Sequence, residues 1–315
     1  MEFVFLLPGQ GSQKVGMGKD LYEAFPAARD AFHVVDDAVG AALSTLAFEG
    51  PADELTRTVN AQPALLAHSA AVWAVIRDAV GKRMVAAAGH SLGEFSAYHV
   101  AGTLDLGAAA RIVRRRGALM FEQGVQRPGA MAAILGVLTA SIDDLCAQAT
   151  AERGLVVPAN YNSEEQVVIS GEVAGVERAM ELAKEAGAKR CLPLPVSGAF
   201  HSPLMAPAVD GLALALDAER WQDPAVPVVA NVNAEPVATA SDARALLLQQ
   251  LTAPVQWTRV MRTLADRHPD AWFVEIGSGA VLSGLARRIA PAVKTSAVGT
   301  VAEIEKFLES VSQNS

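Results

Sequence analysis

The sequence is poor in cysteine, in charge and in aromatic residues. Cys146 and Cys191 are the only cysteines among 315 residues, too few for a disulfide framework and typical of a reducing compartment. Charged residues make up 19% and hydrophobic residues 51%, a balance that excludes a disordered chain. The net charge is −8, which argues against non-specific binding of nucleic acid because that binding needs a basic surface.

Long apolar runs and metal-ligand motifs are also missing. No run approaches the ~20 apolar residues that span a bilayer. The first run, Phe3 to Leu7, is too short for a signal-peptide core and follows Glu2 rather than a basic segment. The chain has no C-x-x-C, no H-E-x-x-H and no calcium loop. We therefore expect a cytoplasmic globular protein with no cofactor and no membrane partner.

The pattern of strands and helices changes in the middle of the chain. Strands spaced by helices predict a mainly parallel sheet covered on both faces. These strands are predicted at Phe3–Leu7, Met84–Ala88, Val226–Val232 and Trp272–Ile276. From 130 to 196 the order becomes β-α-β-β-α-β, as in a ferredoxin-like unit. We predict a hydrolase-like α/β body at 1–127 and 198–315, interrupted by a ferredoxin-like subdomain at 128–197.

The strongest local motif is Gly89-His90-Ser91-Leu92-Gly93, a G-x-S-x-G sequence between an apolar strand and a helix. A tight strand-to-helix turn needs small residues on both sides of the serine and exposes its hydroxyl at the helix N-terminus. A chance match is the alternative, since glycine and serine are common. The flanking strand and helix favour Ser91 as a nucleophile.

A serine nucleophile needs a base, and the chain has six histidines. His33, His68 and His99 lie in helical patterns typical of packing or surface residues, and His268 is expected to face water. His201 lies in a loop that leads into a helix, a common place for a functional side chain, although a helix-cap region explains it equally well. His90 is interpreted as a support for the turn.

Two further segments bear on the chemistry. Gly9-Gln10-Gly11 follows the first strand, but Lys14 stands where a dinucleotide fingerprint has its third glycine. This turn could supply a backbone N–H to an oxyanion hole or be an ordinary turn. Arg114-Arg115-Arg116 is interpreted by default as solvated charge near a helix C-terminus. At most two of the three can point into a cleft, because neighbours on a helix point ~100° apart.

Together these segments resemble the malonyl-CoA:acyl-carrier-protein transacylases of bacterial fatty acid synthesis. G-x-S-x-G alone is shared with many hydrolases, whereas the ordered set covers nearly the whole chain. The matching pieces are Pro8–Gln13, Gln62–Ala64, Gly89–Glu94, Arg116-Gly117, Asn160–Ser163, Val167–Gly171, Gly198–Pro203, Gln250-Leu251, Pro254–Trp257 and Glu275–Gly277.

The resemblance implies a role for each matching residue. Ser91 is the nucleophile, His201 its general base and acid, and Arg116 the partner of the malonyl carboxylate. A backbone carbonyl near Gln250, rather than an aspartate, orients the histidine. The remaining implied site residues are the backbone N–H groups of Gln10 and Leu92 as the oxyanion hole, and His90, Gln250, Phe200 and Asn160 in support. Phe200 is typical of enzymes that take malonyl rather than branched units.

The implied reaction is ping-pong, with malonyl-CoA and acyl carrier protein as partners and a malonyl-serine ester between them. Carrier proteins are usually acidic, so docking on a chain of net charge −8 requires a local basic patch. Lys189, Arg190, Arg287 and Arg288 are candidates for it, with ordinary solvated surface as the alternative.

Other functions remain open at this point. A free-standing acyltransferase of a polyketide synthase has the same chemistry and a different carrier protein. A serine thioesterase or hydrolase suits G-x-S-x-G but does not need Arg116. A non-catalytic scaffold is disfavoured because Ser91, His201 and Arg116 are all present. RNA binding by the subdomain is disfavoured because its strands lack stacking aromatic pairs. A monomer is expected, because an active site between body and subdomain needs no second chain.

Overall fold

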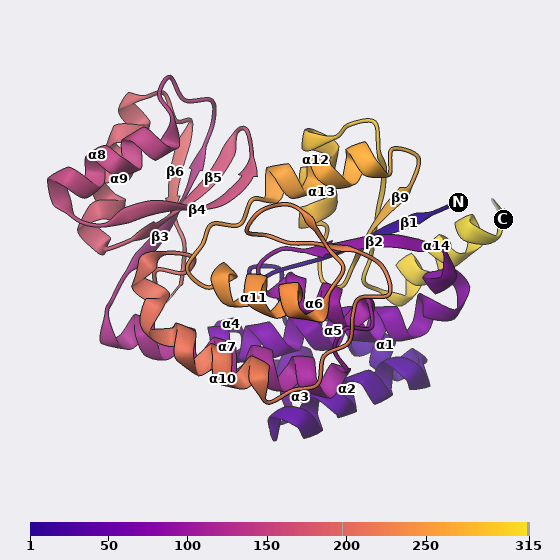
Figure 1. The fold of residues 1–315 in the computed structure, drawn as a ribbon. Coiled ribbons are helices and arrows are strands. Elements are labelled where there is room, and N and C mark those ends of the chain that lie inside the picture. Colours follow the sequence, from indigo (N-terminus) through magenta and orange to yellow (C-terminus); the bar gives the residue numbers. More distant parts are fainter. Residues whose placement is uncertain (197, 314–315) are drawn as a thin grey trace.

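The computed structural model describes residues 1–196 and 198–313. Ser197, at the predicted boundary between subdomain and body, lies outside the described residues. The chain forms two separate sheets (Figure 1). The larger one has the strand order β10-β9-β1-β2-β7-β8, and all its pairings are parallel except that of β7 with β8. Its strands are β1 (Phe3–Leu7), β2 (Met84–Gly89), β7 (Val228–Val229), β8 (Pro236–Val237), β9 (Trp272–Ile276) and β10 (Lys294–Val298).

Helices cover both faces of this sheet. They are α1 (Lys19–Ala24), α2 (Pro26–Val39), α3 (Leu43–Glu49), α4 (Ala52–Thr56), α5 (Thr58–Val80), α6 (Leu92–Val100), α7 (Leu106–Gln126), α10 (Val209–Asp217), α11 (Ala240–Gln250), α12 (Trp257–Arg267), α13 (Val281–Ile289) and α14 (Val301–Gln313). Two 3₁₀ turns, η1 (Gly81–Arg83) and η2 (Pro203–Ala208), accompany them.

Strand β1 shows why its sequence is apolar throughout. Phe3, Phe5 and Leu7 belong to the core under α2, α5 and α7, whereas Val4 and Leu6 belong to the core under α12 and α13. Side chains alternate between the two faces of a strand, so a strand covered on both faces must be apolar at every position. The parallel body predicted from the sequence is confirmed.

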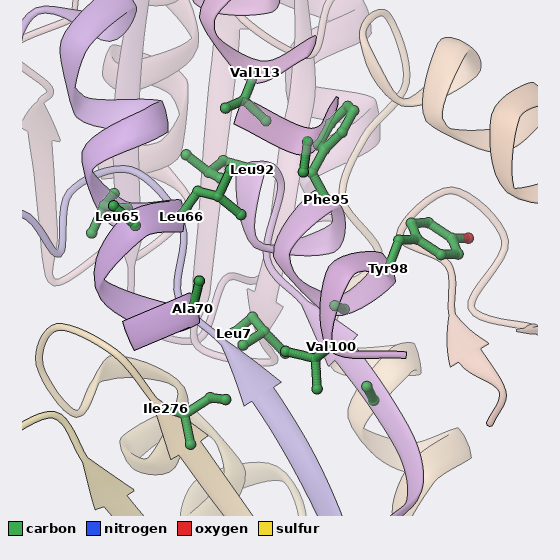
Figure 2. Close-up of a cluster of buried hydrophobic side chains, with 14 of the residues drawn as sticks. Leu7, Leu65, Leu66, Ala70, Leu92, Phe95, Tyr98, Val100, Val113 and Ile276 are labelled. Atoms are coloured by element: carbon green, nitrogen blue, oxygen red, sulfur yellow. The ribbon is translucent and has the colours of Figure 1, made fainter. Parts of the chain in front are cut away.

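The core beneath the active-site turn is formed by α5 and α6. In Figure 2, Leu66 of α5 points toward Leu92 of α6 and Leu7 lies at the end of β1. Leu65 and Phe95 belong to the same buried cluster. All five side chains are buried. This packing fixes the start of α6, which follows the G-x-S-x-G turn directly.

Helix α5 together with η1 is long and apolar enough to cross a membrane by length and composition. Polar residues, among them Gln62 and His68, interrupt its apolar run. In the structure 67% of its most apolar stretch is buried inside the protein. Burial of this kind is typical of a central core helix, so the hydropathy of α5 is weak evidence for a membrane span.

The smaller sheet has the strand order β4-β5-β3-β6 and is antiparallel. Its elements are β3 (Ala130–Leu135), α8 (Ile142–Arg153), β4 (Val156–Ser163), β5 (Gln166–Gly171), α9 (Val173–Glu185) and β6 (Arg190–Pro193). Ala132 and Ile134 face the helices α8 and α9, whereas Met131 and Ala133 join the core of the body. The predicted β-α-β-β-α-β order is therefore present, with its helix-free face toward the body (Figure 1).

Several predicted elements need correction. The strand predicted at 226–232 contains only two residues, Val228 and Val229, and two short strands, β8 and β10, were not predicted. These strands lie at or next to the sheet edges, where few apolar residues are needed and the sequence pattern is weak. Helix α7 spans Leu106–Gln126, so the arginine run lies in its middle rather than near its C-terminal end.

Candidate active site

Ser91 lies on a sharp turn between β2 and α6. Its backbone has φ 51° and ψ −107°, a conformation that residues other than glycine rarely adopt. The flanking glycines are required by close approach. A Cβ on Gly89 would lie 1.9 Å from the Gly93 carbonyl, and a Cβ on Gly93 would lie 2.0 Å from the Leu7 oxygen. The spacing of G-x-S-x-G therefore follows from how tightly the turn packs on itself and on β1.

His201 is in hydrogen-bond contact with Ser91. The distance from Ser91 Oγ to His201 Nε2 is 2.7 Å. The other ring nitrogen, Nδ1, faces two carbonyl oxygens, Gln250 O at 2.9 Å and Ala253 O at 3.2 Å. Because a carbonyl only accepts, the Nδ1 atom carries the proton and the lone pair of Nε2 faces the serine hydroxyl. Two backbone carbonyls thus occupy the place that an aspartate takes in a Ser-His-Asp triad.

Electrostatics keep this imidazole neutral. Burial, and then the positive charge of Arg116, lower the pKa of His201 to about 3. A neutral imidazole at pH 7 can accept the serine proton, which a protonated one cannot. The residue is 4% exposed and has a positive φ of 56°, so the loop before η2 is held in a strained conformation to present the ring.

Arg116 alone of the three consecutive arginines enters the site. Arg114 donates to Val59 O and Asn60 Oδ1, and Arg115 pairs with Glu122. The expectation of a solvated run near a helix C-terminus is therefore wrong for Arg116, which is 1% exposed in the middle of α7. Burial lowers its pKa to about 10, and the guanidinium remains a cation at neutral pH.

The guanidinium of Arg116 contacts the nucleophile directly and is otherwise held by neutral side chains. Nη2 donates to Ser91 Oγ at 3.1 Å and to Gln250 Oε1 at 2.9 Å, and Nη1 donates to Gln62 Oε1 at 2.8 Å. None of the ion pairs found within residues 1–196 and 198–313 involves Arg116. A buried cation held by amide oxygens can pair with an incoming carboxylate.

A cavity of about 240 Å³ opens over these groups. Both sheets line it, because β4 is joined to the body through a parallel bridge between Asn160 and Val255. The residues that line it are Gln10, Gly11, Gln13, Thr56, His90, Ser91, Leu92, Arg116, Met120, Met131, Asn160, Leu194, Pro195, Val196, Phe200 and His201. Every residue named for the site from the sequence lines this cavity except Gln250, which lies behind Arg116.

The two backbone N–H groups named from the sequence, those of Leu92 and Gln10, belong to residues that line the cavity. Leu92 is the first residue of α6, where the N–H has no acceptor within the helix and the helix dipole favours negative charge. The neighbouring Ser91 N–H is already used, because it donates to Asn231 Oδ1 at 2.7 Å. Gln10, in the turn after β1, lines the same cavity, and its side-chain Nε2 donates to Thr58 Oγ1 at 3.1 Å.

His90, Asn160 and Phe200 form walls of the site. His90 Nε2 lies 2.8 Å from Asn162 Oδ1, and its ring packs against Trp257 at 5.4 Å between centroids. Burial lowers the pKa of His90, although the Asn162 contact partly offsets this effect. Phe200 and Asn160 are 5% and 7% exposed. None of these three carries a hydrogen bond to Ser91 or to the ring of His201.

Sequence reading missed Asn231, Glu94 and Gln62 as contributors to the site. Asn231 bridges the turn by accepting from Ser91 N–H and donating to Gly89 O at 2.7 Å. Glu94 is fully buried, and burial raises its pKa to about 7. The sequence signal for Glu94 was a single charged residue in the otherwise uncharged stretch from Leu92 to Tyr98. Asn231 carried no such signal, because it comes from a segment 140 residues away.

The other residues considered lie elsewhere. His33 contacts Tyr22, His68 contacts Gly299 O, and His99 contacts Leu104 O. Lys189 and Arg190 lie at the smaller sheet, where Arg190 pairs with Leu135 at the opposite end of β3 from Met131. Arg287 and Arg288 lie on α13 of the body and are exposed. Over the part of the chain that is described, no group of three metal-ligating side chains occurs.

The fold and the Ser-His-Arg site define a serine acyltransferase. The model of the acyl transferase domain matches residues 4–304, so the chain belongs to this family. The malonyl CoA-acyl carrier protein transacylase of Bacillus subtilis (strain 168) is 45% identical over 312 residues, which cover 99% of this chain and 98% of that protein. The resemblance stated from the sequence motifs is confirmed.

Solved structures agree with this assignment. The acyl-carrier-protein S-malonyltransferase of Bartonella henselae is 44% identical, with a TM-score of 0.93 over 99% of this chain and 100% of that one. A malonyl-transacylase solved in complex with its type II polyketide synthase acyl-carrier protein is 42% identical. Its TM-score is also 0.93, over 98% of this chain and 100% of that one.

Proposed function

We propose that this chain transfers the malonyl group from malonyl-CoA to the phosphopantetheine thiol of acyl carrier protein for fatty acid synthesis. The observation that carries the proposal is the buried Arg116 guanidinium, 3.1 Å from the hydroxyl of Ser91. A nucleophile beside a buried cation selects an acyl group that ends in a carboxylate. The names of the relatives agree with this substrate.

In the first half-reaction, Ser91 Oγ attacks the thioester carbonyl as His201 Nε2 takes the hydroxyl proton. The N–H groups of Leu92 and Gln10 stabilise the oxyanion that forms. The C–S bond then breaks, His201 returns the proton to the departing CoA sulfur, and a malonyl ester remains on Ser91. The carbonyls of Gln250 and Ala253 hold the imidazole in the required tautomer throughout.

In the second half-reaction, the carrier thiol attacks the ester carbonyl. His201 takes the thiol proton and gives it to Ser91 Oγ as the ester bond breaks, which restores the free enzyme. Arg116 holds the distal carboxylate of the malonyl group in both steps. The same geometry therefore serves both acyl donors, malonyl-CoA in the first step and the malonyl ester of Ser91 in the second. His90, Gln250, Phe200 and Asn160 support the site by packing and by hydrogen bonds rather than by proton transfer.

The domain boundaries, the absence of a cofactor, the location and the docking surface are part of the same proposal. The body is assigned to 1–127 and 198–315 and the ferredoxin-like subdomain to 128–197, with a hydrolase-like interpretation of the body supported by the strand-turn-helix at Ser91. The chemistry uses the chain's own side chains and no cofactor. Two free cysteines support a cytoplasmic location. Exposed basic residues at Lys189, Arg190, Arg287 and Arg288 are the proposed contacts for an acidic carrier protein.

Intact-protein mass spectrometry after brief mixing with malonyl-CoA tests the proposal. Wild type is expected to gain one malonyl group and to lose it on addition of carrier protein, whereas Ser91→Ala gains none. The Ser91→Ala rate should fall by a factor on the order of 10³ or more. Release of CoA with no adduct would instead favour a hydrolase, and neither adduct nor release would favour a binding protein.

A second candidate is a free-standing acyltransferase of a polyketide synthase. The structural relative bound to a type II polyketide carrier protein favours this possibility, at 42% identity. The two functions share every chemical step and differ in the thiol acceptor. Rates of transfer from the malonyl-enzyme to a fatty acid carrier protein and to a polyketide carrier protein distinguish them.

A further inference from the structure

Glu94 is a buried acid in the helix that carries the nucleophile, and the reaction does not use it. Its exposed fraction is 0%. One oxygen, Oε2, accepts from Gln250 Nε2 at 2.7 Å and from the Asn231 N–H at 3.2 Å. The other, Oε1, has no hydrogen-bond partner among the described residues. Burying a carboxyl group costs free energy, and the two hydrogen bonds to Oε2 offset part of that cost.

The Gln250 contact decides which way the Gln250 amide points. An amide has a donor end and an acceptor end. Gln250 Nε2 donates to Glu94 Oε2 and to Ser91 O at 3.0 Å, and as a result Gln250 Oε1 faces Arg116 Nη2 at 2.9 Å. If the amide turned over, its NH₂ group would face the guanidinium, and two donors would oppose each other.

The Asn231 contact works in the same way on the turn. Glu94 Oε2 fixes the backbone of Asn231, and the Asn231 side chain bonds both Ser91 N–H and Gly89 O. The Oε2 oxygen of Glu94 therefore holds the serine turn through Asn231 and the Arg116 guanidinium through Gln250. Gln62 holds Nη1 of the same guanidinium from the other side.

We propose that Glu94 is a positioning residue that sets selectivity for acyl groups ending in a carboxylate, by fixing the Gln250 amide so that its oxygen orients Arg116. The inference rests on the proposed function, because it assumes that Arg116 receives the malonyl carboxylate. The property that matters is an acceptor oxygen at the Oε2 position. A glutamine at 94 can supply that oxygen, whereas a methionine of similar length cannot.

The test compares loading from malonyl-CoA with loading from acetyl-CoA, which has the same thioester and no carboxylate. In Glu94→Met, kcat/KM for malonyl loading is expected to fall roughly 10- to 100-fold more than for acetyl loading, mainly through KM, as for a misplaced charged hydrogen bond. Glu94→Gln is expected to keep the wild-type malonyl-to-acetyl ratio within about threefold. Tyr98→Phe, which removes an unpartnered buried hydroxyl one turn along the same helix, is the matched control and should leave the ratio unchanged.

A second variant tests the next link if Glu94→Met does not fold. Gln250→Met keeps the backbone carbonyl that holds His201 but removes the amide, so it should lower the malonyl-to-acetyl ratio by at least the same factor. An unchanged ratio in Gln250→Met would contradict the inference. Equal losses of malonyl and acetyl loading in Glu94→Met would also contradict it, because that result would show that Glu94 supports the serine turn alone. So would a malonyl-to-acetyl ratio in Glu94→Gln as low as that in Glu94→Met. If wild type forms no malonyl adduct, the proposed function fails as well, whereas a normal wild type with any of these three results contradicts the inference only.

Discussion

The two sheets contribute differently to one cavity. The parallel body supplies the three side chains to which proton transfer and charge are assigned in the proposed reaction, Ser91, His201 and Arg116, together with the polar residues that hold them. The antiparallel sheet supplies Met131 and Asn160, and the segment after it supplies Leu194 to Val196. Parallel strands end at one edge in turns and helix N-termini that present donors, whereas the helix-free face of the smaller sheet presents side chains as a wall. The proposed chemistry therefore comes from the body alone, whereas the wall of the cavity is shared by the body and the smaller sheet.

The largest effect should come from the proton-transfer group of the body. His201→Ala is expected to lower the rate of malonyl loading by about 10²–10⁴-fold, the usual worth of a positioned general base. Stopped-flow release of CoA measures this rate. Asn160→Ala, across the cavity on the smaller sheet, serves as the comparison and should lose less than tenfold. Equal losses would contradict the division between chemistry and wall.

The next largest effect concerns the stability of the turn. Gly89→Ala would place a Cβ 1.9 Å from the Gly93 carbonyl, and the resulting displacement is expected to destabilise the fold by about 3 kcal/mol or more. Gly284→Ala on α13 meets no atom within 4 Å and should stabilise by about 0.5–1 kcal/mol through helix propensity. Urea denaturation of both variants measures the two changes, and a tolerated Gly89→Ala would show that the turn can relax.

The free energy of unfolding should depend on pH through Glu94, the buried acid of the body. The pKa of Glu94 is raised by burial from 4.5 to about 7, so the folded state holds a proton that the unfolded state loses. The free energy of unfolding therefore falls as pH rises from about 4.5 to about 7, by about 3 kcal/mol from this group. Between pH 4 and pH 8, Glu94→Gln should gain about 3 kcal/mol relative to wild type in urea denaturation. A constant difference between the two proteins would show that Glu94 does not titrate there.

The smallest effect should come from the wall. Met131→Ala enlarges the apolar side of the cavity while every polar contact of Ser91 and Arg116 stays in place. Malonyl loading is expected to change less than about fivefold, and bulkier acyl-CoA substrates should gain relative to malonyl-CoA by about 10-fold, the scale of one or two methylene groups in a pocket. Competition between acyl-CoA pairs measures this ratio. A loss as large as that in His201→Ala would remove the contrast between the sheets.

Much of the fold could be predicted because local patterns were strong. The strands predicted at Phe3–Leu7 and Trp272–Ile276 agree with the structure to the residue, since each is a short, almost entirely apolar run. The edge strand Lys294–Val298 was missed because half-exposed residues give little pattern. The arginine run was interpreted by default as charge near a helix C-terminus, whereas α7 continues ten residues beyond Arg116.

The sequence by itself determined the elements, their order and the motif spacing, because periodicity and tight turns are properties of neighbouring residues. Gly89 and Gly93 had to flank Ser91 for that reason. Only the tertiary structure decided which of three arginines is buried, that two backbone carbonyls orient His201, and that Glu94, Asn231 and Gln250 meet behind the serine. The contacts among Glu94, Asn231, Gln250, Ser91 and Arg116 join residues 134 to 159 positions apart, and those of His201 with its two carbonyls join residues 49 and 52 positions apart. No local pattern encodes a contact whose geometry depends on how whole helices and strands pack.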